Sequence, residues 1–223
     1  IDKKKHVIEK MQIKENMSVL DIGCGWGGMA LQIAKDTGAK VKGITLSKNQ
    51  LATAQKRAQE EGLNEKVSFV LQDYRNERNS YDRIVSIGMF EHVGVKYFPI
   101  FLSKIYESLK DSGIFLLHTI GQSSKPSATS PWIRKYIFPG GYIPSLSEII
   151  IETEKLKMNV TDIEILRMHY AYTLDHWYKR TMNNKEKIIK MFDAKFLRMW
   201  EFYLLISKYS FVNMGNVVFQ IQI

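Results

Sequence analysis

The sequence predicts an α/β fold built on a seven-stranded, mostly parallel, Rossmann-like sheet. Short apolar runs alternate with stretches of helical periodicity over the first half of the chain, and this alternation is typical of a parallel sheet covered on both faces. A glycine-rich turn follows the first apolar run and opens the first helical stretch. The later half adds a strand pair separated by helices, which fits seven strands better than a six-stranded dinucleotide-binding sheet.

Strands and helices alternate in the first half of the chain. Met29 to Lys35 shows helical spacing of its apolar residues, and Ser47 is placed to cap a helix that continues through Glu61. A third helix is expected at about 97–110. The strands are expected at 17–22, 41–46, 67–71, 84–87 and 114–117.

The alternation ends after His118. The Ser-, Pro- and Gly-rich stretch that follows cannot form a long helix, and we expect 121–157 to be an inserted cap or lid. A strand is then expected at 158–167, helices at about 173–207 and a closing strand at 216–221. The four prolines of the lid are Pro126, Pro131, Pro139 and Pro144.

Composition limits the classes of protein that the chain can represent. Its 223 residues, 45% of them hydrophobic, can form one large globular domain with a substantial core. A single cysteine excludes an internal disulfide framework and suits the cytoplasm, and no apolar run reaches the roughly 18 residues of a membrane-spanning helix. The net charge of +9 divides evenly between the two halves. We therefore expect a dispersed basic surface and no nucleic-acid partner.

The glycine turn Asp21 to Gly28, read DIGCGWGG, is a candidate ligand site. Glycines allow a close approach of the backbone, and the helix N-terminus attracts negative groups. The pattern alone is weak evidence, because dinucleotide enzymes and simple tight turns share it. Asp21, two residues before the first glycine, favours S-adenosylmethionine over NAD, since the ammonium of that ligand needs a carboxylate. Cys24 is expected to be a small packing residue, not a nucleophile.

The segment SIGMFEHVG at 86–94 places Glu91 and His92 directly after an apolar strand. Burying such a carboxylate costs free energy unless a positive or hydrogen-bonding group holds it. Either a helix N-terminus satisfies Glu91 or a functional site requires it. His92 is expected to be packed or bonded to backbone, and a lone His118 at a strand end is most simply a satisfied core residue. The simplest expectation for a group of aromatic residues is also that they belong to the core. They are Trp132, Tyr136, Tyr142, Tyr170, Tyr172 and Trp177.

Six motifs, taken together, resemble the cyclopropane-fatty-acyl-phospholipid synthase family and the related mycolic acid cyclopropane synthases. They occur in order over nearly the whole chain, from about Glu9 to Ile223, and the later ones are far more specific than the glycine turn. They are DIGCGWGG, GITLSKNQ at 43–50, SIGMFEHVG, FLLHTIG at 115–121, PWIRKYIFPGG at 131–141 and HYAYTLDHW at 169–177. The resemblance implies the class I S-adenosylmethionine-dependent methyltransferase fold.

The resemblance implies a cofactor site for S-adenosylmethionine, with S-adenosylhomocysteine as the product. The glycine turn would line the methionine and ribose side, Thr45 and Gln50 would meet the ribose hydroxyls, and the segment after the third strand would lie at the adenine edge. The implied residues are Asp21, Gly23, Gly25, Trp26, Gly27, Thr45, Leu46, Ser47, Gln50, Gln72, Asp73 and Tyr74.

The resemblance also implies a catalytic site that holds bicarbonate and no metal ion. Methyl transfer to an alkene creates a cation that must be shielded from water and then deprotonated. Bicarbonate would be the base and Glu91 would orient it, while His118 and Tyr170 would donate hydrogen bonds to it. The implied catalytic positions are Glu91, His118, the carbonyl of Ile120 and Tyr170.

The implied function is methylene transfer to the cis double bond of unsaturated acyl chains in membrane phospholipids, forming cyclopropane fatty acids. Its implied setting is a bacterial cytoplasm, peripheral at the inner membrane surface, with a homodimer as a further expectation. The alternatives are a methyltransferase of the same fold that acts on a soluble amine and a non-catalytic cofactor-binding domain. The family's upstream cysteine-containing segment and N-terminal helical domain match nothing in this chain. We therefore expect residues 1–223 to be the single catalytic domain of a longer protein.

Overall fold

Seven strands form one sheet in the order β3-β2-β1-β4-β5-β7-β6 in the computed structural model, which describes residues 2–223. Strands β1 to β5 are parallel, and β7 runs antiparallel to both of its neighbours. The predicted seven-stranded, mostly parallel sheet is confirmed. Its strands are β1 (Ser18–Ile22), β2 (Lys40–Thr45), β3 (Val67–Leu71), β4 (Tyr81–Ile87), β5 (Leu109–Gln122), β6 (Asp162–Ile165) and β7 (Asn216–Gln222).

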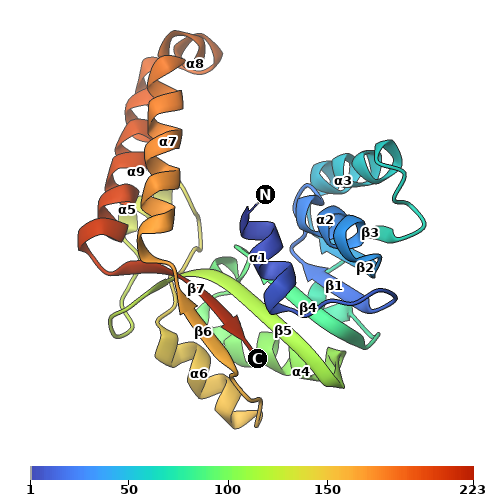
Figure 1. Cartoon of the computed structure of the whole chain (residues 1–223). Helices are drawn as coiled ribbons and strands as arrows, with labels where there is room; N and C mark the ends of the chain where they lie inside the picture. Colours follow the sequence, from blue (N-terminus) through green and yellow to red (C-terminus); the bar gives the residue numbers. More distant parts are fainter. Residues whose placement is uncertain (1) are drawn as a thin grey trace.

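Helices cover both faces of this sheet (Figure 1). Ser47 caps α3 as predicted, because its side chain accepts a hydrogen bond from the Gln50 backbone. The helices are α1 (Asp2–Lys10), α2 (Gly28–Thr37), α3 (Lys48–Glu60), α4 (Phe98–Ser108), α5 (Pro131–Tyr136), α6 (Leu146–Lys155), α7 (Arg167–Asn183), α8 (Lys185–Met191) and α9 (Ala194–Asn213). Three short 3-10 turns are η1 (Tyr74–Asn76), η2 (Phe90–His92) and η3 (Val95–Tyr97).

Alternate residues of the central strands feed two cores. Val19 and Val85 pack with α1, α2 and α3 on one face, whereas Leu20 and Ile84 pack with α4 and α6 on the other. Both faces of β1 and β4 are therefore buried, which explains why these strands are nearly continuous apolar runs.

Helices α7 and α9 form a long antiparallel hairpin that projects from the sheet and carries α8 at its far end (Figure 1). A third core holds the base of the hairpin to β7, with Leu174, Leu204 and Phe211 buried against Val218. None of the helices within residues 2–223 is both long enough and apolar enough to cross a bilayer.

Several predicted boundaries were wrong. The expected strand at 114–117 is the middle of the longer β5, and the strand expected at 158–167 is only Asp162–Ile165. Helix α7 begins at Arg167, not near residue 173, so Tyr170 lies on a helix. Helix α1 was not predicted at all.

The proposed lid at 121–157 contains the short helix α5 and the helix α6. Its first part is closed at the base, because the Gln122 N–H donates to the Pro144 carbonyl at 2.9 Å. The aromatic residues that the sequence assigned to the core are not all buried: Tyr136 in α5 of the lid and Tyr172 in the later α7 are exposed. Helices α5 and α7 each have a face exposed to solvent, which the sequence did not predict.

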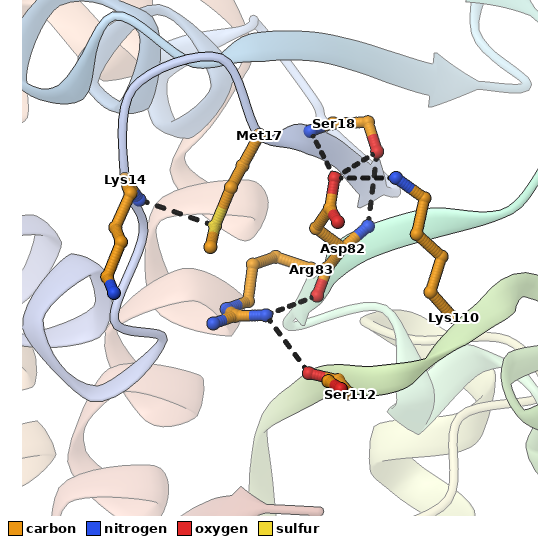
Figure 2. Close-up of polar contacts among 7 residues, drawn as sticks. All are labelled: Lys14, Met17, Ser18, Asp82, Arg83, Lys110 and Ser112. Carbon is orange, nitrogen blue, oxygen red and sulfur yellow. Dashed lines mark hydrogen bonds and ion pairs between the residues drawn. The ribbon is translucent and has the colours of Figure 1, made fainter.

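A polar network ties β1 to β4 at the edge of the sheet where these parallel strands begin (Figure 2). One carboxylate oxygen of Asp82 accepts hydrogen bonds from the Ser18 N–H at 2.8 Å and the Ser18 hydroxyl at 2.7 Å, and it pairs with Lys110 at 2.9 Å. These donors, the Ser18 N–H first, hold the pKa of Asp82 well below its usual range. The network stabilises the edge opposite to the candidate site.

Candidate functional site

The glycine turn lies at the carboxyl end of β1, the edge where parallel α/β sheets place their ligands. The backbone N–H groups of Gly23 and Cys24 both donate to the Ile44 carbonyl at 3.0 Å, which holds the turn against β2. Gly25 has φ +55, and a Cβ built there meets no atom within 4 Å. A Cβ at Gly27, by contrast, would lie 2.6 Å from Phe69. Gly25 thus faces open space that a ligand can enter.

Asp21 lies at the end of β1 and is 2% exposed. Its Oδ2 atom is buried without a hydrogen-bond partner among the described residues. Burial raises the pKa of the carboxyl to about 7, although the nearby Ala30 backbone N–H opposes the shift. A buried carboxylate oxygen without a partner is costly, so this position fits a ligand that supplies a cationic donor.

The segment after β2 brings three predicted cofactor residues together. The Thr45 hydroxyl donates to the Gln50 side-chain oxygen at 2.8 Å and accepts from the Ser47 N–H at 3.2 Å. Leu46 is 72% exposed beside them, and Trp26 of the glycine turn is 53% exposed. Polar groups flanked by uncovered apolar side chains offer a surface that a ribose and an aromatic ring can cover.

The predicted residues after β3 have other partners. Gln72 bonds to Glu77 at 2.9 Å, and Asp73 forms a two-pronged pair with Arg75. Tyr74 packs edge-on against Phe101. The side chains of Gln72 and Asp73 are thus engaged within the protein, which leaves the backbone of this turn as its main contribution to a ligand site.

Glu91 lies on η2, just beyond the end of β4, and its two carboxylate oxygens differ. Oε1 accepts a hydrogen bond of 2.7 Å from the Ile120 backbone N–H, whereas Oε2 is buried and finds no partner in the described chain. Burial raises the pKa of the carboxyl, while the Ile120 N–H opposes the shift. The hydrogen bond to Oε1 thus comes from a strand, β5, and not from a helix N-terminus.

Strand geometry explains why the Ile120 backbone is available. Phe115 and Ile223 exchange both backbone hydrogen bonds, so every second residue of β5 faces β7. His118 and Ile120 face the opposite side, where the His118 carbonyl accepts from Gly88 at the end of β4. Ile120 lies beyond that end, so its N–H and carbonyl both point to the region occupied by Glu91.

His118 is buried, and its Nδ1 atom lies 3.1 Å from the side-chain nitrogen of Gln220 on β7. Burial lowers the pKa of the imidazole to about 4, with a smaller effect of Lys3 in the same direction. His118 is therefore neutral near pH 7. With the Gln220 amide donating to Nδ1, the ring proton lies on Nε2, which is left as a hydrogen-bond donor.

Tyr170, on the first turn of α7, is half-buried between Phe211 and Trp177, with ring centroids at 5.1 and 6.1 Å. Burial raises the pKa of its phenol, and the charge of Glu91 raises it further. The buried Tyr203 of α9 lies close enough to Tyr170 for that phenol to contribute to its own raised pKa, which burial mainly brings to about 12. Glu91 thus contacts Ile120 directly and lies close enough to Tyr170 for its charge to act on the phenol, whereas the hydrogen-bond partner of His118 among the described residues is Gln220.

Two residues near these sites can be compared with their expected environments. His92 is exposed rather than packed, with Phe138 at 6.0 Å between ring centroids. Cys24 is buried as expected, and burial raises the pKa of its thiol to about 12, so it is not a thiolate.

Sequence reasoning missed Gln220 and Tyr203. Gln220 lies between the apolar residues Phe219 and Ile221, and an amide between two apolar residues of the expected closing strand was the available signal. No comparable signal marked Tyr203. Within residues 2–223, His, Cys, Asp and Glu side chains gather nowhere in groups of three or more that suit a metal ion.

Comparison with known proteins gives consistent matches. The Mycolic acid cyclopropane synthetase family profile matches residues 1–221. The cyclopropane-fatty-acyl-phospholipid synthase of Escherichia coli K12 is 43% identical over 202 residues, which cover 91% of this chain and 52% of that protein. The chain therefore spans about half the length of this curated relative.

Solved structures match the fold over 99% of the chain. The mycolic acid cyclopropane synthase CmaA1, complexed with SAH and CTAB, superposes with a TM-score of 0.92 at 29% identity, over 82% of its own chain. Coclaurine N-methyltransferase, bound to N-methylheliamine and SAH, superposes with a TM-score of 0.84 at 26% identity, over 70% of its own chain.

Proposed function

Since the chain belongs to the mycolic acid cyclopropane synthetase family, we propose that it converts cis double bonds in phospholipid acyl chains into cyclopropane rings. Its fold is that of the S-adenosylmethionine-dependent methyltransferases, as the sequence predicted. The observation that carries the proposal is the buried Oε2 atom of Glu91, which has no partner among the described residues, while Oε1 of the same carboxylate is held by Ile120 of β5.

S-adenosylmethionine is the proposed methyl donor. Oδ2 of Asp21 would accept from its ammonium group, the open face of Gly25 would allow its backbone to approach, and Thr45 with Gln50 would meet its ribose. When bound, it supplies an electrophilic methyl group. The SAH complex of the similar CmaA1 structure supports this assignment.

Bicarbonate is the proposed second component. A protonated oxyanion needs one acceptor and several donors. Oε2 of Glu91 would be the acceptor, and Nε2–H of His118 and the Tyr170 phenol would be the donors. When bound, bicarbonate supplies the base that removes the proton lost on ring closure. Glu91 would orient it, while the surrounding apolar and aromatic side chains exclude water from the cation formed on the acyl chain.

Peripheral association with the cytoplasmic face of the membrane is proposed because the acyl substrate resides in a bilayer. A chain of net charge +9 is attracted to anionic lipid. No anchor is needed for such binding, since apolar contact and surface charge together hold peripheral proteins.

Mass spectrometry tests the function directly. The full-length protein is incubated with unsaturated phospholipid vesicles and S-adenosylmethionine whose methyl group carries three deuterons. A ring retains two of these deuterons, because one deuteron leaves the transferred methyl group when the ring closes. A methyl-branched alkene, whose proton leaves from the acyl chain instead, retains all three. Saturated phospholipid is the control, and no labelled lipid with cofactor still bound would reject the proposal.

A soluble amine acceptor is the second candidate function, favoured by the match to coclaurine N-methyltransferase. The same labelled donor distinguishes it. Methylation of an added amine at a rate that exceeds the rate with lipid would transfer the proposal to that class.

A further inference from the structure

The tip of the projecting hairpin, residues 179–198, holds a cluster of positive charge. This cluster was not apparent when the net charge was counted over the two halves of the sequence. It contains seven Lys and Arg residues and two Asp and Glu residues, a net charge of +5 out of the chain's +9. Among residues 2–223, only Lys179 of these seven cations forms an ion pair, with Asp175. The six others are Arg180, Lys185, Lys187, Lys190, Lys195 and Arg198.

Apolar side chains are exposed at the same tip. Ile189 is 40% exposed, Met191 64% and Phe192 59%, all on α8 or the turn after it. Singly exposed apolar residues are common on protein surfaces. Three neighbours at the end of a projecting element, surrounded by unpaired cations, instead resemble an interfacial anchor, with an apolar tip and a basic rim.

A row of aromatic rings leads from this tip toward the candidate catalytic site. Phe192 stacks on Phe196 at 4.2 Å between centroids, Phe196 lies parallel to Trp200 at 6.3 Å, and Trp200 contacts Tyr203 at 5.0 Å. The row begins at an exposed ring and ends at buried Tyr203, the neighbour of Tyr170. A series of ring contacts thus connects the tip with the neighbourhood of Tyr170.

We propose that the α8 tip docks on an anionic phospholipid bilayer, with Met191 and Phe192 entering the interface and Lys185, Lys187 and Lys190 contacting lipid phosphates. This inference rests on the proposed function for the reason that a membrane should lie here. Charge complementarity favours an anionic surface and opposes pairing of two tips, each of net charge +5. The projection of the hairpin lets the tip touch a flat surface before the sheet does (Figure 1).

The test is flotation of the full-length protein with phosphatidylglycerol vesicles and with phosphatidylcholine vesicles, without methyl donor. Each basic residue near an anionic surface contributes about 1 kcal/mol, so the triple variant Lys185→Gln, Lys187→Gln, Lys190→Gln should bind phosphatidylglycerol about a hundredfold more weakly. Met191→Ser with Phe192→Ser should weaken binding at both low and high salt. Circular dichroism and Tm establish that each variant folds.

The matched control removes the same charge from exposed positions on α2, β2 and α3, as Lys35→Gln, Lys40→Gln, Lys56→Gln. This control should bind the vesicles within a few-fold of the unmodified protein. Equal weakening of control and tip variants would overturn the inference in favour of diffuse attraction. Unchanged vesicle binding with an altered sedimentation mass would instead assign the tip to a second copy.

Flotation requires no turnover, so the inference and the function are tested apart. Tip-dependent binding without lipid product would retain the docking surface and reject the chemistry. Lipid product without tip-dependent binding would retain the proposed chemistry and reject the docking surface.

Discussion

The Ile120 backbone N–H donates a 2.7 Å hydrogen bond to Oε1 of Glu91. This bond joins the loop after β4 to the part of β5 that extends beyond β4, and it fixes the carboxylate while leaving Oε2 unused. The Tyr142 N–H from the lid donates to the Glu91 carbonyl at 2.9 Å. Glu91 is therefore held on both its side chain and its backbone.

Glu91→Gln should separate activity from stability. The amide oxygen can still accept from Ile120, but it cannot act as an anion, so product formation should fall by about 10²–10⁴-fold. Because burial raises the pKa of Glu91, its charge disfavours the folded state near pH 7, and the variant should be at least as stable. Lipid mass spectrometry and thermal unfolding measure the two effects. Exposed Glu107→Gln is the control, and a variant with full activity would exclude Glu91 from catalysis.

Asp21 should make the stability of the ligand-free protein depend on pH. Its folded pKa of about 7 lies above the ~3.9 of an unfolded chain. The folded state therefore binds more protons between these values, and the Asp21 contribution to stability grows as pH falls from 7 to 4. Denaturant unfolding should show this slope disappear in Asp21→Asn and persist in exposed Asp36→Asn.

Binding of S-adenosylhomocysteine should reduce the pH dependence of stability that Asp21 causes. An ammonium group beside Asp21 favours the charged carboxylate, so the affinity measured by calorimetry should decrease as pH falls below 7. An affinity that is constant with pH would show that the ligand does not contact this carboxylate.

His118 should make the free energy of unfolding change with pH in the direction opposite to that of Asp21. Its folded pKa of about 4 lies below the ordinary 6.5, so the unfolded state binds more protons between them. The contribution is present above pH 6.5 and is lost as pH falls to 4, amounting to about 3 kcal/mol. His118→Gln should remove it, which unfolding free energies at several pH values can measure. Identical profiles for the variant and the unmodified protein would contradict a buried neutral imidazole.

Two glycine substitutions should fail in different ways. Gly25→Ala places a methyl group in open space at φ +55, so folding should weaken by only about 1 kcal/mol while cofactor binding is lost. Gly27→Ala drives a Cβ against Phe69 and Ala54 and should destabilise the fold by about 1–3 kcal/mol or more. Tm and calorimetry with S-adenosylhomocysteine distinguish them. Retained affinity in Gly25→Ala would place the ligand elsewhere.

The strands were predictable where local sequence decides them. The strands β1 and β4, which are buried on both faces, are apolar runs, and the edge strand β3 was predicted at its observed bounds. The length of β5 was not predictable, because residues 118–122 are extended through pairing with β7 nearly a hundred residues later. Helix α1 was missed because its apolar residues, Val7 and Ile8, are few and become significant only against the sheet.

The candidate site was predictable by resemblance but not by local pattern. Nothing near His118 in the sequence indicates its partner Gln220, since that contact depends on strand order. The tip charges were missed for another reason. Counting by halves averaged residues 179–198 with less basic neighbours, and only the hairpin geometry identifies them as one surface.

The position of β7 between β5 and β6 has a consequence for biosynthesis. This strand, residues 216–222, is translated after the six other strands of the sheet, yet it pairs with both neighbours and supplies the Gln220 partner of His118. A nascent chain can therefore assemble the cofactor half first, with β5 exposing an unpaired edge until translation reaches β7. The need for chaperones during synthesis should therefore depend on how long this edge of β5 stays unpaired.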